Sequence, residues 1–222
     1  MGVSGTNAVY VWDLWVRLFH WGLAAAMALA WYSAEQGIAW QQVHAWSGYA
    51  VIVLLAFRLL WGLFGSETAR FSQFLTGPRR VLNYLRHWRH GASHSIGHNP
   101  IGGWAVVVLL AVPFVQAASG LFATDEILFS GPLNPWVSSS TADALTSLHV
   151  QLFDLVLALV IVHVAAIGAY RLFRGDRLVK PMITGYKDSV SYQPRIAPAH
   201  RALALLAGVI AVFAALLAAA SA

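Results

Sequence analysis

Five long apolar stretches dominate the pattern of hydrophobic and polar residues along the chain. They cover residues 14–33, 43–65, 101–124, 147–170 and 202–220. Each is close to the ~20 residues that an α-helix needs to cross a hydrocarbon core of ~30 Å. Apolar and polar residues do not alternate with a period of two inside these stretches, which argues against the strands of a membrane barrel. The pattern therefore predicts an all-α fold, a membrane helical bundle.

The segments between the stretches are short, so we expect a single membrane domain over residues 1–222. The first stretch is longer than the apolar core of a signal peptide, and we expect it to be retained as a helix. The composition agrees, because 59% of the residues are hydrophobic and 10% are charged. The chain contains no cysteine. This excludes disulfides, iron–sulfur clusters and thioether-linked haem.

The lysines and arginines lie on one side of the predicted bundle. Segments 66–100 and 171–201 carry nearly all of the 14 basic residues, whereas segments 34–42 and 125–146 carry none. Short cytoplasmic loops hold the excess of positive charge, so we expect the N-terminus inside a bacterial cytoplasmic membrane and the C-terminus outside. The sequence "GPRRVLNYLRHWRHG" predicts a basic amphipathic helix on the inner membrane surface. We expect membrane lipid as a partner and no nucleic acid.

Four histidines lie within the apolar stretches. His149 and His163 are fourteen residues apart in the fourth stretch, which is ~21 Å of helix and nearly the same helix face. His20 lies near the inner end of the first stretch, and His44 lies near the outer end of the second. The depths pair His20 with His163 and His44 with His149. Facing imidazoles in a helical bundle are the ligands of a six-coordinate b-type haem, so we predict two stacked, non-covalent haems with irons ~20 Å apart.

Three further residues are candidates for contacts with these haems. Arg58 follows His44 by fourteen residues and shares the depth of the inner pair, where a haem propionate would pair with its buried charge. Arg17, one turn before His20, is a second candidate for the same role. Gly48, one turn after His44, would let a porphyrin edge approach the backbone closely, although glycines also pack membrane helices together.

Two other interpretations of the polar residues remain open. Membrane histidines and Asp154 can relay protons, which would make the chain a haem-free proton-coupled transporter. A second histidine cluster has spacings suggestive of a metal site and comprises His87, His90, His94 and His98. Gly91 interrupts this cluster and neither acids nor thiols surround it, so a polar loop is the favoured interpretation.

Several motifs together resemble the prokaryotic cytochrome b-561 family, which includes the b-type subunits of nickel–iron hydrogenases. They are "VWDLWVRLFHW", "HAWSGYAVIVLLAFRLLWG", "GHNPIGGW" and the His149/His163 pair. The resemblance covers about residues 10–175. It implies a four-helix core with two b haems, for which His20, His44, His149 and His163 match the axial ligands. His98 matches the histidine of the "HNP" turn. The resemblance implies that this histidine acts near the inner haem or the quinone.

The same resemblance implies a function. We expect a transmembrane di-haem cytochrome that transfers electrons between the quinone pool and a periplasmic redox partner, such as a c-type cytochrome. The alternative is the b-type subunit of a hydrogenase or a similar multi-subunit dehydrogenase. The outer segment 125–146 holds three acidic residues and would attract a partner with a positive face, unless these acids only follow the charge rule. Segment 202–220 lies outside the four-helix core and is expected to be a peripheral packing or docking helix.

Overall fold

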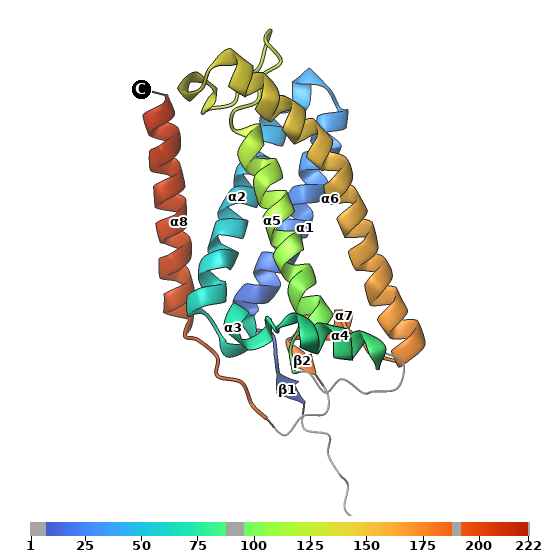
Figure 1. The fold of residues 1–222 in the computed structure, drawn as a ribbon. Helices are drawn as coiled ribbons and strands as arrows, with labels where there is room; N and C mark the ends of the chain where they lie inside the picture. The colour runs from blue at the N-terminus through green and yellow to red at the C-terminus, as the bar shows by residue number, and fades with distance from the viewer. Residues whose placement is uncertain (1–7, 88–95, 188–191, 222) are drawn as a thin grey trace, which may run out of the picture.

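Five long helices lie side by side in the computed structural model, which describes residues 8–87, 96–187 and 192–221 (Figure 1). They are α1 (Leu14–Glu35), α2 (Gln41–Phe64), α5 (Pro100–Gly120), α6 (Ser139–Arg174) and α8 (Ala199–Ala220). All five are long and apolar enough to cross a membrane. The prediction of an all-α membrane helical bundle is confirmed.

The helix α6 is longer than the apolar stretch that predicted it. It has 36 residues and begins at Ser139, where the Ser138 side chain accepts a hydrogen bond from the backbone N–H of Thr141. It ends at Arg174, and the following Gly175 adopts a left-handed conformation with φ of 70°. The first turns of α6 are polar, so hydropathy alone could not assign them to a membrane helix. Their capping residue marks the true start.

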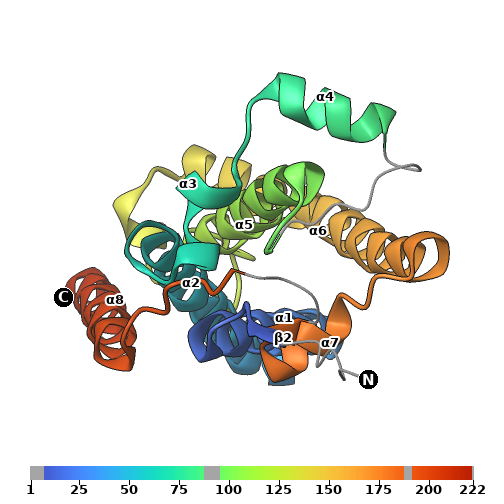
Figure 2. The same ribbon diagram turned by 90° about the horizontal axis from the view of Figure 1, so that it is seen from below.

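The packing order separates a four-helix core from a peripheral fifth helix. The helix α1 packs along α2, α5 packs along α6, and α2 contacts α5 and α8. Seen from below, α8 lies at the edge of the bundle beside α2 (Figure 2). The rings of Tyr49 and Phe213, 5.6 Å apart, form part of this contact. The core that can position the histidines therefore consists of α1, α2, α5 and α6.

A set of hydrogen bonds fixes the segment that leads into α8. The Glu67 carboxylate, in the short 3-10 helix η2 (Glu67–Ala69), accepts hydrogen bonds from the backbone N–H of Arg195 at 2.9 Å and from the Tyr192 hydroxyl at 2.5 Å. The Ser66 hydroxyl accepts one from the backbone N–H of Ala197 at 3.0 Å. The bonds from Arg195 and Tyr192 lower the pKa of Glu67. The ionised carboxylate therefore anchors the start of α8 to the end of α2.

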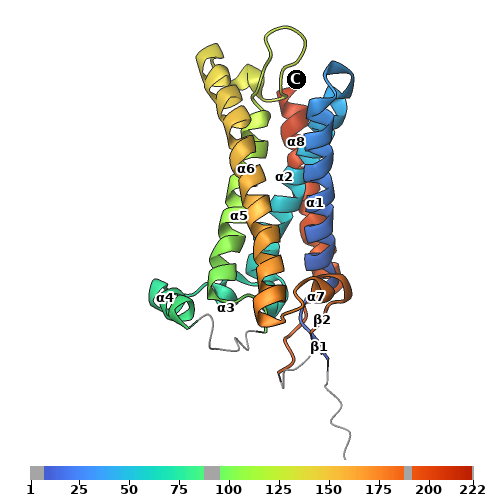
Figure 3. The same cartoon turned by 90° about the vertical axis from the view of Figure 1, so that its right-hand side faces the viewer.

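Short elements gather at one end of the bundle (Figure 3). They are α3 (Phe71–Phe74), α4 (Pro78–Arg86), α7 (Val179–Thr184), β1 (Val9–Tyr10) and β2 (Tyr186–Lys187). The strands β1 and β2 pair antiparallel, with Val9 opposite Lys187. The carbonyl of Gly185 also accepts hydrogen bonds from the backbone N–H groups of Val11 and Trp12. We call this sheet and its Gly185 bonds the clasp, because it joins the chain before α1 to the chain after α6.

The helix α4 corresponds to the predicted amphipathic helix. It spans Pro78–Arg86, and it lies outside the bundle beside the end of α5, crosswise to the long helices (Figure 2). Proline at its first position suits a helix start, because the missing N–H is one that a helix leaves unpaired there. The remainder of the predicted helix, from residue 88, lies outside the described residues.

The opposite end of the bundle holds the connections between α1 and α2 and between α5 and α6. Two short 3-10 helices, η1 (Ile38–Trp40) and η3 (Asn134–Trp136), lie in these connections. In the second connection, the backbone of Thr124 bridges that of Ser130 to close a loop. This loop extends beyond the helix ends (Figure 1). We refer to this end as the outer end and to the end with the clasp as the inner end.

Candidate haem site

The four membrane histidines meet in two pairs. The rings of His20 on α1 and His163 on α6 are 6.4 Å apart between centres, and the rings of His44 on α2 and His149 on α6 are 6.0 Å apart. Two imidazoles whose nitrogens each bind one metal at ~2 Å have ring centres roughly 6 Å apart. Each pair is therefore spaced to hold one metal ion. These are the pairings that the depths predicted.

Backbone carbonyls orient both rings of the outer pair. The His44 Nδ1 lies 2.8 Å from the carbonyl oxygen of Ala30, and the His149 Nδ1 lies 2.7 Å from that of Gln116. A carbonyl can only accept, so each Nδ1 carries the proton and donates it. Each Nε2 then keeps a free lone pair for a metal.

Gly120 at the end of α5 leaves room for the His149 ring. A Cβ atom at Gly120 would lie 2.8 Å from the His149 Cε1 and 3.0 Å from its Nδ1. Only glycine therefore allows α5 to approach the ring this closely. The sequence around Gly120 does not indicate this role, because nothing in the local pattern shows which side chain of α6 the glycine faces.

Arg58 lies buried beside the inner pair, with 3% of its surface exposed. Its guanidinium carbon lies 6.0 Å from the ring centre of Phe19, which is adjacent to His20, and 5.3 Å from that of Phe71. Its NH1 nitrogen has no hydrogen-bond partner among the described residues. A buried cation with an unused donor is costly unless an anion meets it. A haem propionate fits this requirement.

Arg17 and Gly48 have different surroundings. The Arg17 guanidinium donates to the carbonyl of Ile183 at 2.7 Å and to the hydroxyl of Tyr10 at 3.3 Å, which leaves its buried Nε without a partner in the described parts of the chain. Both of its terminal nitrogens therefore donate to residues of α7 and the clasp. A Cβ at Gly48 would meet nothing within 4 Å, so the face of α2 one turn from His44 borders open space. A flat ring could approach the backbone there.

His98 is buried at the inner end between two aromatic rings. Its ring centre lies 4.8 Å from that of Trp12 and 4.6 Å from that of Phe74. Burial lowers the pKa of His98 to about 3, and the nearby Arg58 and His163 contribute to the same shift. His98 is therefore neutral at physiological pH. Its Nδ1 is buried and has no partner within the described ranges, so it is available to a ligand near Arg58.

The other histidines of the predicted loop cluster do not join His98. His87 is exposed, and its Nδ1 lies 2.9 Å from the carbonyl oxygen of Asn83. His90 and His94 lie outside the described residues. Within the described ranges, three or more His, Cys, Asp or Glu side chains nowhere come together as a metal site.

The "HNP" turn has a structural explanation apart from its histidine. The Asn99 side chain caps α5 by accepting a hydrogen bond from the backbone N–H of Gly102 at 2.7 Å, and Pro100 occupies the first helical position. The Asn99 amide donates to the Tyr170 hydroxyl at 2.9 Å, and this hydroxyl lies 3.0 Å from that of Tyr84. Tyr170 lies two turns after His163. The turn thus ties α4, α5 and α6 together below the inner pair.

Asp13 is a buried carboxylate near the inner pair that the sequence analysis did not select. It is 2% exposed, and it caps α1 by accepting a hydrogen bond from the backbone N–H of Val16 at 2.8 Å. Its other oxygen accepts from the indole N–H of Trp61 at 3.0 Å. The signal was present, since aspartate before an apolar helix is a common capping residue. What the sequence could not show was its partner on α2.

Asp154 does not face the histidine pairs. It follows His149 by five residues, which turns it ~140° around α6. It is exposed in the structure.

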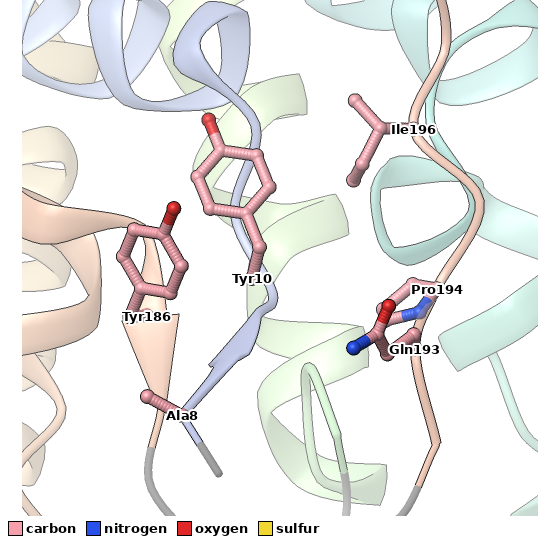
Figure 4. A pocket seen from close by; sticks show the side chains of 6 residues that line it. All are labelled: Ala8, Tyr10, Tyr186, Gln193, Pro194 and Ile196. Carbon is pink, nitrogen blue, oxygen red and sulfur yellow. The ribbon is translucent and has the colours of Figure 1, made fainter.

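The chain also forms a pocket of about 270 Å³ at the inner end, between the clasp and the segment that leads to α8 (Figure 4). Its lining consists of Ala8, Tyr10, Tyr186, Gln193, Pro194 and Ile196. None of these residues belongs to a membrane-spanning helix or to a histidine pair. The pocket is therefore separate from the candidate haem site.

The residues present fit two non-covalent haems. Each pair offers two facing imidazoles at metal-binding separation, and Arg58 and His98 each offer a buried nitrogen without a hydrogen-bond partner in the described residues near the inner pair. The chain has no cysteine for a thioether attachment. Iron held between two histidines without covalent attachment is the arrangement of a b-type haem.

Comparisons with known proteins bear on this fit. Neither the curated proteins nor the solved structures contain a match to the chain. The family model described as prokaryotic cytochrome b561 matches residues 11–185, which include all four membrane histidines. The match covers most of the chain and the whole four-helix core, and the chain therefore belongs to the prokaryotic cytochrome b561 family.

Proposed function

We propose that this membrane b-type cytochrome binds two haems, one between the rings of each histidine pair, and exchanges electrons between the quinone pool and a redox partner at its outer end. The observation that carries the proposal is that α6 contributes one histidine to each of two pairs whose ring spacing suits a metal ion. These two histidines, His149 and His163, lie fourteen residues apart on nearly the same face of α6. A protein that reacts at one membrane surface would need only one pair. Two pairs at opposite depths form a path for electrons across the membrane.

Each haem, when bound, supplies a one-electron carrier, and the side chains supply its position and surroundings. The Nε2 atoms of His44 and His149 are held toward the metal position by the bonds of their Nδ1 atoms to backbone carbonyls. Arg58 provides a cation for a propionate, and Arg17 and His98 are further candidates for polar contacts near the inner pair. The alternative of a haem-free transporter does not fit a chain that belongs to a cytochrome family.

We expect the inner end to face the cytoplasm of a bacterial cell, because the basic segments flank that end. A reporter fused within α4 should therefore behave as cytoplasmic, and reporters fused after Asp125 or at the C-terminus as periplasmic. A cytoplasmic C-terminus would show that α8 does not span the membrane, whereas a periplasmic α4 would reverse the whole assignment.

Reconstituted vesicles test the function. A short-chain quinol should reduce the haems, and a positively charged c-type cytochrome added at the outer face should exchange electrons with them. Salt should slow the second exchange, because the outer segment 125–146 is acidic and salt screens surface charges. If only a soluble dehydrogenase partner exchanges electrons with the haems, the chain is a hydrogenase-type b subunit instead. If neither the quinol nor any partner does so, the proposal fails.

A further inference from the structure

The two histidine pairs differ in the hydrogen bonds of their rings. In the outer pair, the Nδ1 atoms of both His44 and His149 donate to backbone carbonyls. In the inner pair, the Nδ1 of His20 is buried and has no acceptor among the described residues. A ligating imidazole that donates its second N–H is a more basic ligand. More basic ligands stabilise the ferric iron more than the ferrous iron, and therefore lower the reduction potential.

The two pairs also differ in the charges around them. The buried guanidinium of Arg58 lies beside the inner pair, over the ring of Phe19. The nearby carboxylate of Asp13 offsets part of this charge. Its oxygens accept hydrogen bonds from the backbone N–H of Val16 and the indole N–H of Trp61. A positive charge in a medium of low dielectric constant stabilises the added electron. The arginine therefore raises the reduction potential of a nearby haem.

The outer end carries the opposite charge. Segment 125–146 has three acidic residues and no basic residue. Hydrogen bonds from the backbone N–H groups of Phe129, Leu128 and Ile127 lower the pKa of Asp125 to about 2, so this carboxylate is ionised at physiological pH. Its effect on the outer pair is smaller than that of a buried charge, because solvent screens it. A negative charge nevertheless lowers the reduction potential of a nearby haem.

Ligand hydrogen bonds and charges thus act in the same direction. We propose that the haem at the inner pair has the higher reduction potential of the two, and that Arg58 is a residue that raises it. This inference rests on the proposed binding of two haems. With both haems bound, one electron would pass downhill from the haem at the outer pair to the haem at the inner pair, and no bond would form or break. The chain favours electron movement from its outer end to its inner end.

Redox titration of variants that keep a single haem tests the order. His149→Leu should retain the inner haem and His163→Leu the outer haem. We expect the midpoint potential of the first variant to be the higher. The opposite order would overturn the inference while leaving the two-haem function intact, whereas a purified wild-type protein without two haems would refute the proposed function itself.

Substitution of Arg58 tests the order even if the single-haem variants do not fold. In the two-haem protein, Arg58→Gln should lower the midpoint of the higher-potential component only, and Arg58→Lys should restore it because the charge returns. Arg201→Gln is the matched control, since Arg201 is an exposed inner-end arginine whose guanidinium donates to the carbonyl of Phe64. A shift confined to the lower-potential component, or equal shifts for Arg58→Gln and Arg201→Gln, would contradict the role of Arg58.

Discussion

Replacement of His20 or of His163 by leucine should remove one and the same haem, and replacement of His44 or of His149 should remove the other. Each pair is spaced for one metal, with ring centres 6.4 Å apart at the inner end and 6.0 Å apart at the outer end. Loss of either ligand leaves the iron with one axial histidine and opens its coordination. The haem content of the purified variants should therefore fall from two per chain to one.

Optical and paramagnetic resonance spectra identify which haem remains. The variants of His20 and His163 should share one spectrum, and the variants of His44 and His149 should share another. The remaining haem should be low-spin in all four variants. His87→Leu is a suitable control, because His87 is exposed and its Nδ1 faces the carbonyl of Asn83 rather than a metal position. If His20→Leu and His44→Leu deplete the same haem, the pairing by depth is wrong.

The largest effect outside the ligands is expected for Gly120→Ala. The added Cβ would lie 2.8 Å from the His149 Cε1, so the ring must move away from its position between α5 and α6. The same movement would disturb the hydrogen bond between the His149 Nδ1 and the Gln116 carbonyl. Loss of an outer-shell contact of a metal ligand typically weakens metal binding roughly 10–100-fold. We expect a loss of this order in the affinity for the outer haem, measured by titration of the apoprotein.

Gly208→Ala provides the comparison for this substitution. Gly208 also lies within a membrane-spanning helix, and a Cβ at this position would meet nothing within 4 Å. The Gly208→Ala variant should bind both haems with the affinities of the unchanged protein. The inner haem should likewise persist in Gly120→Ala. Equal loss of both haems would indicate general misfolding rather than a local effect on His149.

The predictable part of the site depends on helical periodicity. A residue's depth in the membrane follows from its position along an apolar helix, and its face follows from the rotation of ~100° per residue. These two quantities are sufficient to pair His20 with His163 and His44 with His149. The apolar stretches also predicted the five long helices, because hydropathy reports the length of a span directly.

The other parts depend on contacts between elements that are distant in sequence. The closeness of Gly120 to His149 requires the distance between α5 and α6, and the bond from Trp61 to Asp13 requires that between α1 and α2. Neither distance is encoded in a single helix. The two-residue strands of the clasp are too short to show any periodicity. Polar turns at the start of α6 escaped the hydropathy pattern for a related reason, since they extend a membrane helix beyond its apolar part.

The clasp also sets an order for biosynthesis. It pairs Val9 with Lys187, so the whole four-helix core must be translated before the clasp can close. At ~5–20 residues per second, the second strand leaves the ribosome roughly 10–40 s after the first. During this interval α1 is in the membrane while its inner end is still unattached to the chain after α6. Assembly of the inner histidine pair is therefore a late event, and the newly made α1 must wait for a partner that is synthesised near the end of the core.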